Sequence, residues 1–264
     1  RRRCPRFVFD YMDGAAEDEL GVAENQNALR RAQIVPRYLI DVSVRDQTTE
    51  LFGHHFAHPF GVAPMGLANM VWPGTDANLA RQAASANMPY TLSTVATTSI
   101  EEAAEAAGEN FWFQLYCPHD ASVRDDLVRR ADAAGAEVLM VTVDVPISAK
   151  RERDIRNRLS LPFHFAGRHV TDAMIRPGWS MRLVRHGNPK FAVLDRYADP
   201  KAGTSAQAGF VASQVARVFT WDDFEKLRAD WPRKLLIKGV MAAEDAAEAK
   251  RRGGDGIVLS NHGG

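Results

Sequence analysis

The sequence has little cysteine and no long apolar run, and these absences exclude several classes of protein. Only Cys4 and Cys117 occur among 264 residues, which is too few, and too widely spaced, for a disulfide framework or a thiolate zinc site. No apolar stretch approaches the roughly 18 residues that a transmembrane helix needs. Lys plus Arg and Asp plus Glu number 33 each, so the chain lacks the net positive charge that would favour a nucleic-acid partner.

Two nucleotide-binding signatures are also missing. No GxGxxG run follows an expected strand and no GxxxxGK[ST] run occurs, so Rossmann dinucleotide sites and Walker phosphate sites lack support. His54, His55 and His58 lie in a segment that we expect to be turn-like, before Pro59, without a carboxylate or cysteine that would complete a ligand set. We therefore predict no metal site.

What the chain does contain is an alternation of short apolar runs and helical stretches. The six apolar runs have the length of strands, and most lack a polar alternation, as in strands buried on both faces; they span 60–65, 90–94, 111–116, 138–143, 235–238 and 257–260. Helical patterns between them include 121–134 behind Asp120, 221–231 behind Thr220, and 242–252. This alternation predicts an α/β fold with parallel strands, either a closed barrel or a doubly wound sheet.

Two segments interrupt this rhythm. Residues 1–50 are polar and helical in pattern, which predicts an amino-terminal helical cap ahead of a β/α domain at 51–264. Within that domain, residues 146–203 form a long insertion between the fourth and fifth expected strands, where prolines and glycines are expected to interrupt any regular element. An insertion of this length is usually a functional lid or a mobile segment.

Polar residues gather at the carboxyl ends of the expected strands, and they are Gly66, Ser93, Gln114, Tyr116, Thr142, Asp144, Lys238 and His262. In a (β/α) barrel these ends share one rim, where active sites are built. Lys238 follows a buried run and needs an anionic partner or a ligand. Asp144 could orient His262 from a nearby strand, which favours acid/base catalysis over a structural histidine.

Simpler interpretations remain open for three of the residues near the rim. Tyr116 could pack and hydrogen-bond at a strand end without any chemical role. Lys238 could be paired with a neighbouring Asp or Glu. Arg151 lies in the mixed-charge run 150–154, which is typical of a solvated face, although its closeness to the rim would also allow it to clamp a carboxylate.

These motifs resemble the FMN-dependent 2-hydroxy acid dehydrogenase and oxidase family. The matching runs occur in the family's order over essentially the whole chain, and they are FDY at 9–11, APMG at 63–66, LST at 92–94, FQLY at 113–116, TVD at 142–144, KG at 238–239 and SNHGG at 260–264. The resemblance implies a (β/α)8 TIM barrel, with about six of the eight strands in this sequence. The runs at 151–154, 177–180 and 184–187 are most similar to the mandelate dehydrogenases of the family.

The resemblance also implies a role for each rim residue. His262 would be the catalytic base, with Asp144 orienting it and stabilising the imidazolium. Arg151 would grip the substrate carboxylate, and Tyr11 and Tyr116 would hydrogen-bond the substrate. FMN would be held by residues that contact the edge or wall of its ring system, with Lys238 near the atoms that gain negative charge on reduction; the set is Pro64, Met65, Gly66, Ser93, Gln114, Thr142 and Lys238.

Within the family, Gly66 favours a dehydrogenase, because the oxidases commonly have alanine there and a missing methyl leaves room beside the flavin. The implied reaction is oxidation of an L-2-hydroxy acid, mandelate-like or lactate, to the 2-oxo acid, with electrons passed to a quinone-type acceptor. An oxidase that uses O2 and releases H2O2 is the nearest alternative. Whether a proton or a hydride leaves the carbon first stays open, since both routes need the same base.

A membrane partner is a further expectation. In the membrane-associated members of the family the insertion after the fourth strand binds the membrane. Here the insertion mixes large apolar side chains with basic ones, which suits an anionic lipid surface, although a soluble lid fits the composition equally well; the residues are Phe163, Phe165, Met174, Ile175, Trp179, Met181, Leu183 and Val184 with Arg168, Arg176, Arg182, Arg185 and Lys190. We expect a cytoplasmic homo-oligomer, peripheral on the inner face of the membrane, that binds no nucleic acid.

The resemblance also predicts that part of the barrel is missing from this sequence. The family continues after Gly263 and Gly264 with an arginine that binds the substrate carboxylate, and later strands carry the loops that bind the FMN phosphate. We expect the sequence to be a fragment of a longer chain, whose remaining segment completes the barrel. A non-catalytic flavin-binding or structural fragment is the alternative from another class of function.

Overall fold

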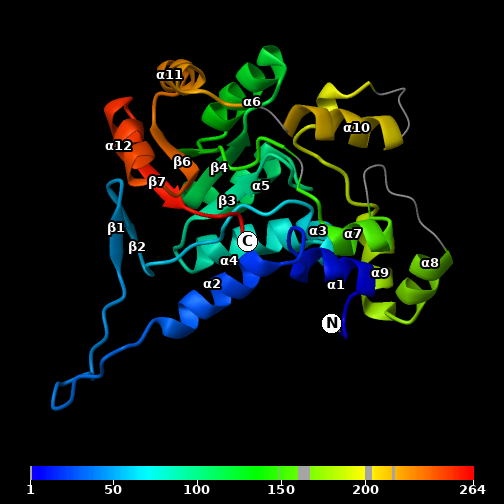
Figure 1. Ribbon diagram of the computed structural model, residues 1–264, viewed down its shortest axis with the longest axis horizontal. Helices are drawn as coiled ribbons and strands as arrows, with labels where there is room; N and C mark the ends of the chain where they lie inside the picture. The colour runs from blue at the N-terminus through cyan, green and yellow to red at the C-terminus, as the bar shows by residue number, and fades with distance from the viewer. Residues whose placement is uncertain (1, 148, 160–166, 200–203, 216–217) are drawn as a thin grey trace.

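The computed structural model describes residues 2–147, 149–159, 167–199, 204–215 and 218–264, and its centre is a parallel sheet. The sheet has five strands in the order β3-β4-β5-β6-β7, every neighbouring pair is parallel, and helices cover its outer face (Figure 1). Its strands are β3 (Tyr90–Ser93), β4 (Phe111–Tyr116), β5 (Val138–Thr142), β6 (Lys234–Val240) and β7 (Gly256–Leu259). These five match five of the six predicted strands.

Twelve α-helices lie in the described residues. They are α1 (Arg6–Asp13), α2 (Leu20–Arg31), α3 (Ala68–Val71), α4 (Thr75–Ser85), α5 (Ile100–Ala107), α6 (Ala121–Ala133), α7 (Glu152–Asn157), α8 (Gly167–Met174), α9 (Pro177–His186), α10 (Thr204–Val215), α11 (Trp221–Asp230) and α12 (Ala243–Arg251), with short 3-10 turns at Gly108–Asn110 and Asp195–Tyr197. The predicted caps are present: Asp120 accepts from the backbone of Ser122, and Thr220 forms a reciprocal capping box with Asp223.

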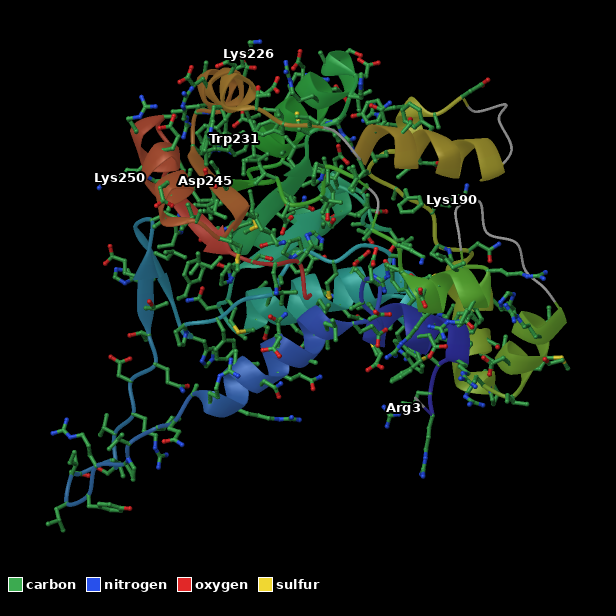
Figure 2. All side chains as sticks on the ribbon, in the orientation of Figure 1. Arg3, Lys190, Lys226, Trp231, Asp245 and Lys250 are labelled. Atoms are coloured by element: carbon green, nitrogen blue, oxygen red, sulfur yellow. The ribbon has the colours of Figure 1, made fainter. Side chains whose placement is uncertain are left out.

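The outer face of the sheet is lined mainly by apolar side chains. On β4 the side chains of Phe111, Phe113 and Leu115 are fully buried in the core beneath the helices. Trp231 belongs to the same core, whereas Lys226 on α11 and Lys250 on α12 point outward (Figure 2). The alternation of side chains along a strand therefore leaves Trp112, Gln114 and Tyr116 for the inner face.

The amino end of the inner face forms a second, smaller apolar core. Trp112, Met140 and Leu236 come from three neighbouring strands, and Phe52 and Phe56 close the end. The two phenylalanines belong to a hairpin of β1 (Thr49–Leu51) and β2 (His54–Phe56), which lies beside β7 (Figure 1).

Two sequence predictions for residues 49–65 are wrong. His54 and His55 lie in β2 and not in a turn-like segment, because Phe52 and Gly53 both have positive φ angles (56° and 88°) and form the tight turn that pairs β2 with β1. Residues 60–65 form no strand and only a single parallel bridge, from Val62 to Tyr90. Pro64 has no N–H to extend that pairing.

The prediction of irregular structure throughout 146–203 is also wrong, because α7, α8 and α9 lie in this insertion. Pro177 occupies the first turn of α9, where its missing N–H costs nothing, and Gly187 follows the last turn at a φ of 78°. These residues bound the helix and do not break it. Phe163 and Phe165 lie outside the described residues.

Candidate active site

A row of three buried polar side chains crosses the inner face near the carboxyl end of the sheet. Ser93 donates its hydroxyl hydrogen to Oε1 of Gln114 at 2.8 Å. Nε2 of Gln114 donates to Oγ1 of Thr142 at the same distance. Because buried polar groups are costly unless they are paired, these bonds fix the orientation of the glutamine amide between its two neighbours.

A second network follows at the rim and joins three distant parts of the chain. Nδ1 of His262 lies 2.9 Å from Oδ1 of Asp144, and Nε2 lies 3.1 Å from the hydroxyl oxygen of Tyr116. A carboxylate only accepts, so Nδ1 carries the proton and Nε2 accepts from Tyr116 in the neutral imidazole. The basic nitrogen is therefore the one turned away from Asp144.

Tyr116 is suited to donate this hydrogen bond. Burial raises the pKa of its hydroxyl, and the negative charge of Asp144 acts in the same direction. The phenol therefore stays protonated at neutral pH.

Lys238 is a partly buried cation beside the same carboxylate. Its Nζ lies 4.0 Å from Oδ2 of Asp144, and both side chains are only 14% exposed. Burial lowers the pKa of Lys238, and Asp144 offsets part of that effect. Oδ2 of Asp144 has no hydrogen-bond partner among the described residues, so the two charges compensate one another without a direct hydrogen bond.

Ser260 connects Lys238 to the backbone of the histidine, and sequence reasoning missed it. Its hydroxyl oxygen accepts from Nζ of Lys238 at 3.1 Å and from the backbone N–H of His262 at 3.0 Å. The alternation along β7 was the available signal, because Val258 faces the inner core and the residue two positions later falls on the same face.

Gly239 makes room for the carboxylate of Asp144. Its φ is 104°, and a Cβ on it would lie 2.6 Å from both Cβ and Cγ of Asp144. The pairing of β6 with β7 shifts register between Lys238 and Val240, so the glycine forms a bulge. Lys238 faces inward on one side of the bulge, while Val240 is buried in the outer core on the other.

Tyr11 and Arg151 form a third group. The hydroxyl of Tyr11 donates to the carbonyl oxygen of Gly66 at 3.4 Å, and the guanidinium of Arg151 lies over the tyrosine ring at 4.9 Å. Arg151 also donates to the carbonyl oxygens of Tyr11 and Gly14. Within the described part of the chain, no hydrogen bond joins this group to His262.

Asp154 holds this arginine and is a second residue that sequence reasoning missed. Its Oδ2 lies 2.7 Å from Nε of Arg151, and burial raises the pKa of its carboxyl while Arg151 acts to lower it. Arg151 is the N-cap residue of α7 and Asp154 lies in its first turn, so their three-residue spacing was the available signal for this pair. Arg151 therefore lies in a partly buried ion pair and not on a solvated face.

The segment before α3 brings Pro64, Met65 and Gly66 next to β3. Met65 is 40% exposed, and a Cβ on Gly66 would lie 2.8 Å from Cγ2 of Val95. The space that a methyl group at position 66 would fill is therefore already occupied by Val95 in this protein.

Comparison with known proteins shows the family of the chain. Residues 1–264 match the family model described as FMN-dependent dehydrogenase. The chain is 38% identical to (S)-mandelate dehydrogenase from Pseudomonas putida and covers 66% of it. It is 40% identical to a putative L-lactate dehydrogenase from Mycobacterium tuberculosis and covers 63% of that protein, and in both comparisons the match includes 100% of this chain.

The fold is similar to that of a solved relative. The crystal structure of the monotopic membrane protein (S)-mandelate dehydrogenase superimposes with a TM-score of 0.92 at 37% identity, over 99% of this chain and 69% of that one. The sheet is therefore part of the same TIM barrel, and the chain spans about two thirds of the length of the relatives it matches. By sequence and by fold, the chain belongs to the family of FMN-dependent dehydrogenases.

Proposed function

We propose that this protein oxidises an L-2-hydroxy acid of the mandelate type, with lactate as a smaller candidate, to the 2-oxo acid, and passes the electrons to a quinone-type acceptor. The observation that carries the proposal is the placement of His262 between Asp144 and Tyr116 at 2.9 Å and 3.1 Å. The names of the relatives support the choice of substrate, because they include a mandelate and a lactate dehydrogenase.

His262 serves as the base of this reaction. Nε2 is the unprotonated nitrogen and takes the proton that leaves the substrate. The charge of the resulting imidazolium is balanced by Asp144, whose carboxylate already accepts from Nδ1 at 2.9 Å. The substrate then competes with Tyr116 for Nε2, and the displaced phenol is free to hydrogen-bond the substrate oxygen.

Tyr11 and Arg151 bind the acid group of the substrate. The guanidinium is planar and always charged, which suits a carboxylate. Asp154 and two carbonyl oxygens fix its orientation before the substrate arrives, so less side-chain entropy is lost on binding.

The residues of the inner face fit FMN. The polar row provides both donors and acceptors on three adjacent strands, as the heteroatom edge of an isoalloxazine ring requires. Lys238 is a partly buried cation without a direct hydrogen bond to a carboxylate among the described residues, which suits a group that gains negative charge. Ser93, Gln114, Thr142 and Lys238 would hold this edge, with residues 64–66 along it. When bound, FMN supplies the acceptor for the two electrons of the substrate.

We further propose that residues 1–50 act as a helical cap on a barrel domain at 51–264, with 146–203 as its insertion. The strands that would complete this barrel lie outside the 264 residues. Two observations support this: the chain spans only 66% of the mandelate dehydrogenase, and among the described residues β7 pairs on one side only, with β6.

The helices of the insertion favour a membrane surface as a partner. None of the described helices is both long and apolar enough to span a bilayer. Helices α8 and α9 and the link between them nevertheless expose five large apolar side chains, by 54–86%, in a segment that also contains several arginines; they are Val170, Met174, Ile175, Met181 and Val184. Trp179 anchors α9 to the rest of the protein, since its Nε1 donates to the carbonyl oxygen of Met70. This arrangement suits interfacial binding without insertion across the membrane.

Anaerobic titration tests the proposed reaction. The FMN-loaded protein is mixed under nitrogen with a panel that includes both enantiomers of mandelate and lactate. We expect the flavin absorbance to bleach with the L acids and to return faster with a quinone than with air. A flavin that none of the acids bleaches contradicts the proposal, and a faster return in air indicates an oxidase.

Vesicle flotation tests the membrane surface. Replacing Met181 and Val184 together by serine should reduce flotation with anionic vesicles, because these two side chains are 72% and 86% exposed on α9. The matched control is Met241→Ser, which removes a methionine that is 68% exposed beyond β6. Equal flotation of all three proteins contradicts the membrane proposal.

A further inference from the structure

Helix α2 contacts the segment that carries His262, although the two are far apart in the sequence. Nδ2 of Asn25 donates to Oδ1 of Asn261 at 3.1 Å, and Nδ2 of Asn261 donates back to Oδ1 of Asn25 at 2.9 Å. The two amides thus form a reciprocal pair across 236 positions of the chain. Figure 1 shows the carboxyl end of the chain beside α2.

The backbones of the two segments also approach closely. A Cβ on Gly21 would lie 2.6 Å from Cα of Gly264, so no other side chain fits at position 21 without a shift. No residue of α2 is buried. The helix therefore contributes little to a hydrophobic core, and its specific contacts are with the 260–264 segment.

His262 needs such support because its backbone is strained. Its φ is 61°, in the left-handed region that is unfavourable for a non-glycine residue. Asn261 stabilises this turn: its side-chain Oδ1 accepts from the N–H of Gly263 at 3.3 Å, and its carbonyl oxygen accepts from the N–H of Gly264 at 3.1 Å. The amide held by Asn25 is thus the amide that caps the turn around the base.

We propose that Asn25 is a positioning residue for the base, and the proposal rests on the proposed function of His262. Asn25 fixes the side chain of Asn261, which holds His262 in its left-handed conformation with the imidazole between Asp144 and Tyr116. The amino-terminal cap thereby determines the orientation of a base that lies at the other end of the chain. Asn25 itself does not touch the substrate or the flavin.

The test is Asn25→Ala in the FMN-loaded protein, followed by rapid mixing with the best substrate under nitrogen. We expect the limiting rate of flavin reduction to fall about tenfold, as for the loss of a paired hydrogen-bonding group, while the substrate dissociation constant and the FMN content stay unchanged. The control is Gln26→Ala, an exposed neighbour on the same helix, which should react at the wild-type rate. A wild-type rate for Asn25→Ala overturns the proposal.

A double mutant separates positioning from a general structural effect. If Asn25 acts through the base, Asn25→Ala should cause no further loss in a His262→Gln background. A further tenfold loss there, or a lower FMN content in the single variant, overturns the proposal. If Asn25→Ala does not fold, Asn25→Asp keeps the shape and one of the two hydrogen bonds, and a wild-type rate for it has the same consequence.

The two proposals fail in different ways. If no 2-hydroxy acid bleaches the wild-type flavin, the proposed function fails. If the wild type is bleached and His262→Gln is not, but Asn25→Ala reacts like the wild type, only the positioning role fails.

Discussion

The two ends of the inner face differ completely in chemistry although the same strands supply both. On β4 the amino end carries Trp112, packed against Phe52 and Phe56 of the hairpin with ring centroids 6.2 and 6.4 Å apart. Further along the same face of β4, the carboxyl end carries Tyr116, which is hydrogen-bonded to His262. On β6 the same face places Leu236 in the apolar core and Lys238 in the rim network.

The side chains that stabilise the fold and the side chains suited to the reaction therefore lie at opposite ends of the inner face. The amino end is apolar and covered, so its side chains stabilise the fold by leaving water. The carboxyl end keeps a lysine and an aspartate that are each only 14% exposed, although burying charge is unfavourable for folding. Mutations at the amino end should therefore change stability, and mutations at the carboxyl end should change the reaction.

The largest expected effect is that of His262→Gln at the carboxyl end. The variant should reduce flavin at least about 100-fold more slowly, because general-base catalysis typically contributes about 10²–10⁴ in rate. FMN content and the free energy of unfolding should change little, since the imidazole is 42% exposed. Anaerobic stopped-flow measures the rate, and a loss of less than about fivefold would mean that another group is the base.

The second effect is that of Trp112→Ala at the amino end. This side chain is only 7% exposed, so its truncation should lower the free energy of unfolding by about 3–5 kcal/mol. The folded fraction should still reduce its flavin at nearly the wild-type rate. Urea denaturation combined with stopped-flow checks both statements, and a rate loss as large as that of His262→Gln would show that the two ends are not separable.

The third effect concerns the segment before α3. Gly66→Ala places a methyl group 2.8 Å from Cγ2 of Val95, and overpacking of this kind should cost about 1–2 kcal/mol of stability. Adding Val95→Ala should restore much of the loss, because it removes the contacting methyl. Thermal unfolding of the single and double variants measures this, and equal stability of Gly66→Ala and the wild type would contradict the clash.

The smallest expected effect is the pH dependence introduced by Lys238. Burial lowers the pKa of this lysine in the folded protein, so the unfolded chain binds the proton more tightly. The free energy of unfolding therefore rises with pH between the lowered pKa and the ordinary value of 10.5. Lys238→Met should lack this rise. Any excess in its free energy of unfolding over that of the wild type should therefore shrink as the pH approaches 10.

The control for Lys238 lies at the other end of the same strand. Lys234 is 39% exposed and pairs with Asp255 at 3.3 Å, so Lys234→Met should follow the wild-type pH dependence more closely. Urea midpoints at pH 7 and pH 10 compare the three proteins. An identical rise in the wild type and Lys238→Met would show that burial does not perturb this lysine.

Local pattern was enough to predict the regular part of the fold. The runs around 111–116 and 138–143 contain mostly apolar side chains, as buried parallel strands do, and they became β4 and β5. The run at 60–65 has a similar composition but forms only one bridge at Val62. The composition of a segment does not show how many backbone hydrogen bonds it will form with its neighbours, because that number depends on the strands around it.

The candidate site was predictable to the extent that it follows strand ends. Asp144 and His262 each follow an apolar run, and parallel strands bring such ends to one rim. Asp154 and Ser260 were missed because they orient other groups. Their partners, Arg151 and Lys238, were predicted because each is a cation near a strand end. A carboxylate or hydroxyl that only orients another side chain looks like an ordinary polar residue in the sequence.

By itself the sequence determined the alternation of strands and helices, the family and the rim on which polar residues gather, because these depend on short-range periodicity and local motifs. Only the tertiary structure decided that the bulge at Gly239 turns Val240 outward and gives Asp144 its space. It also decided that Asn25 meets Asn261. Contacts of this kind depend on how whole elements pack, and no local pattern in the chain encodes which distant residues will become neighbours.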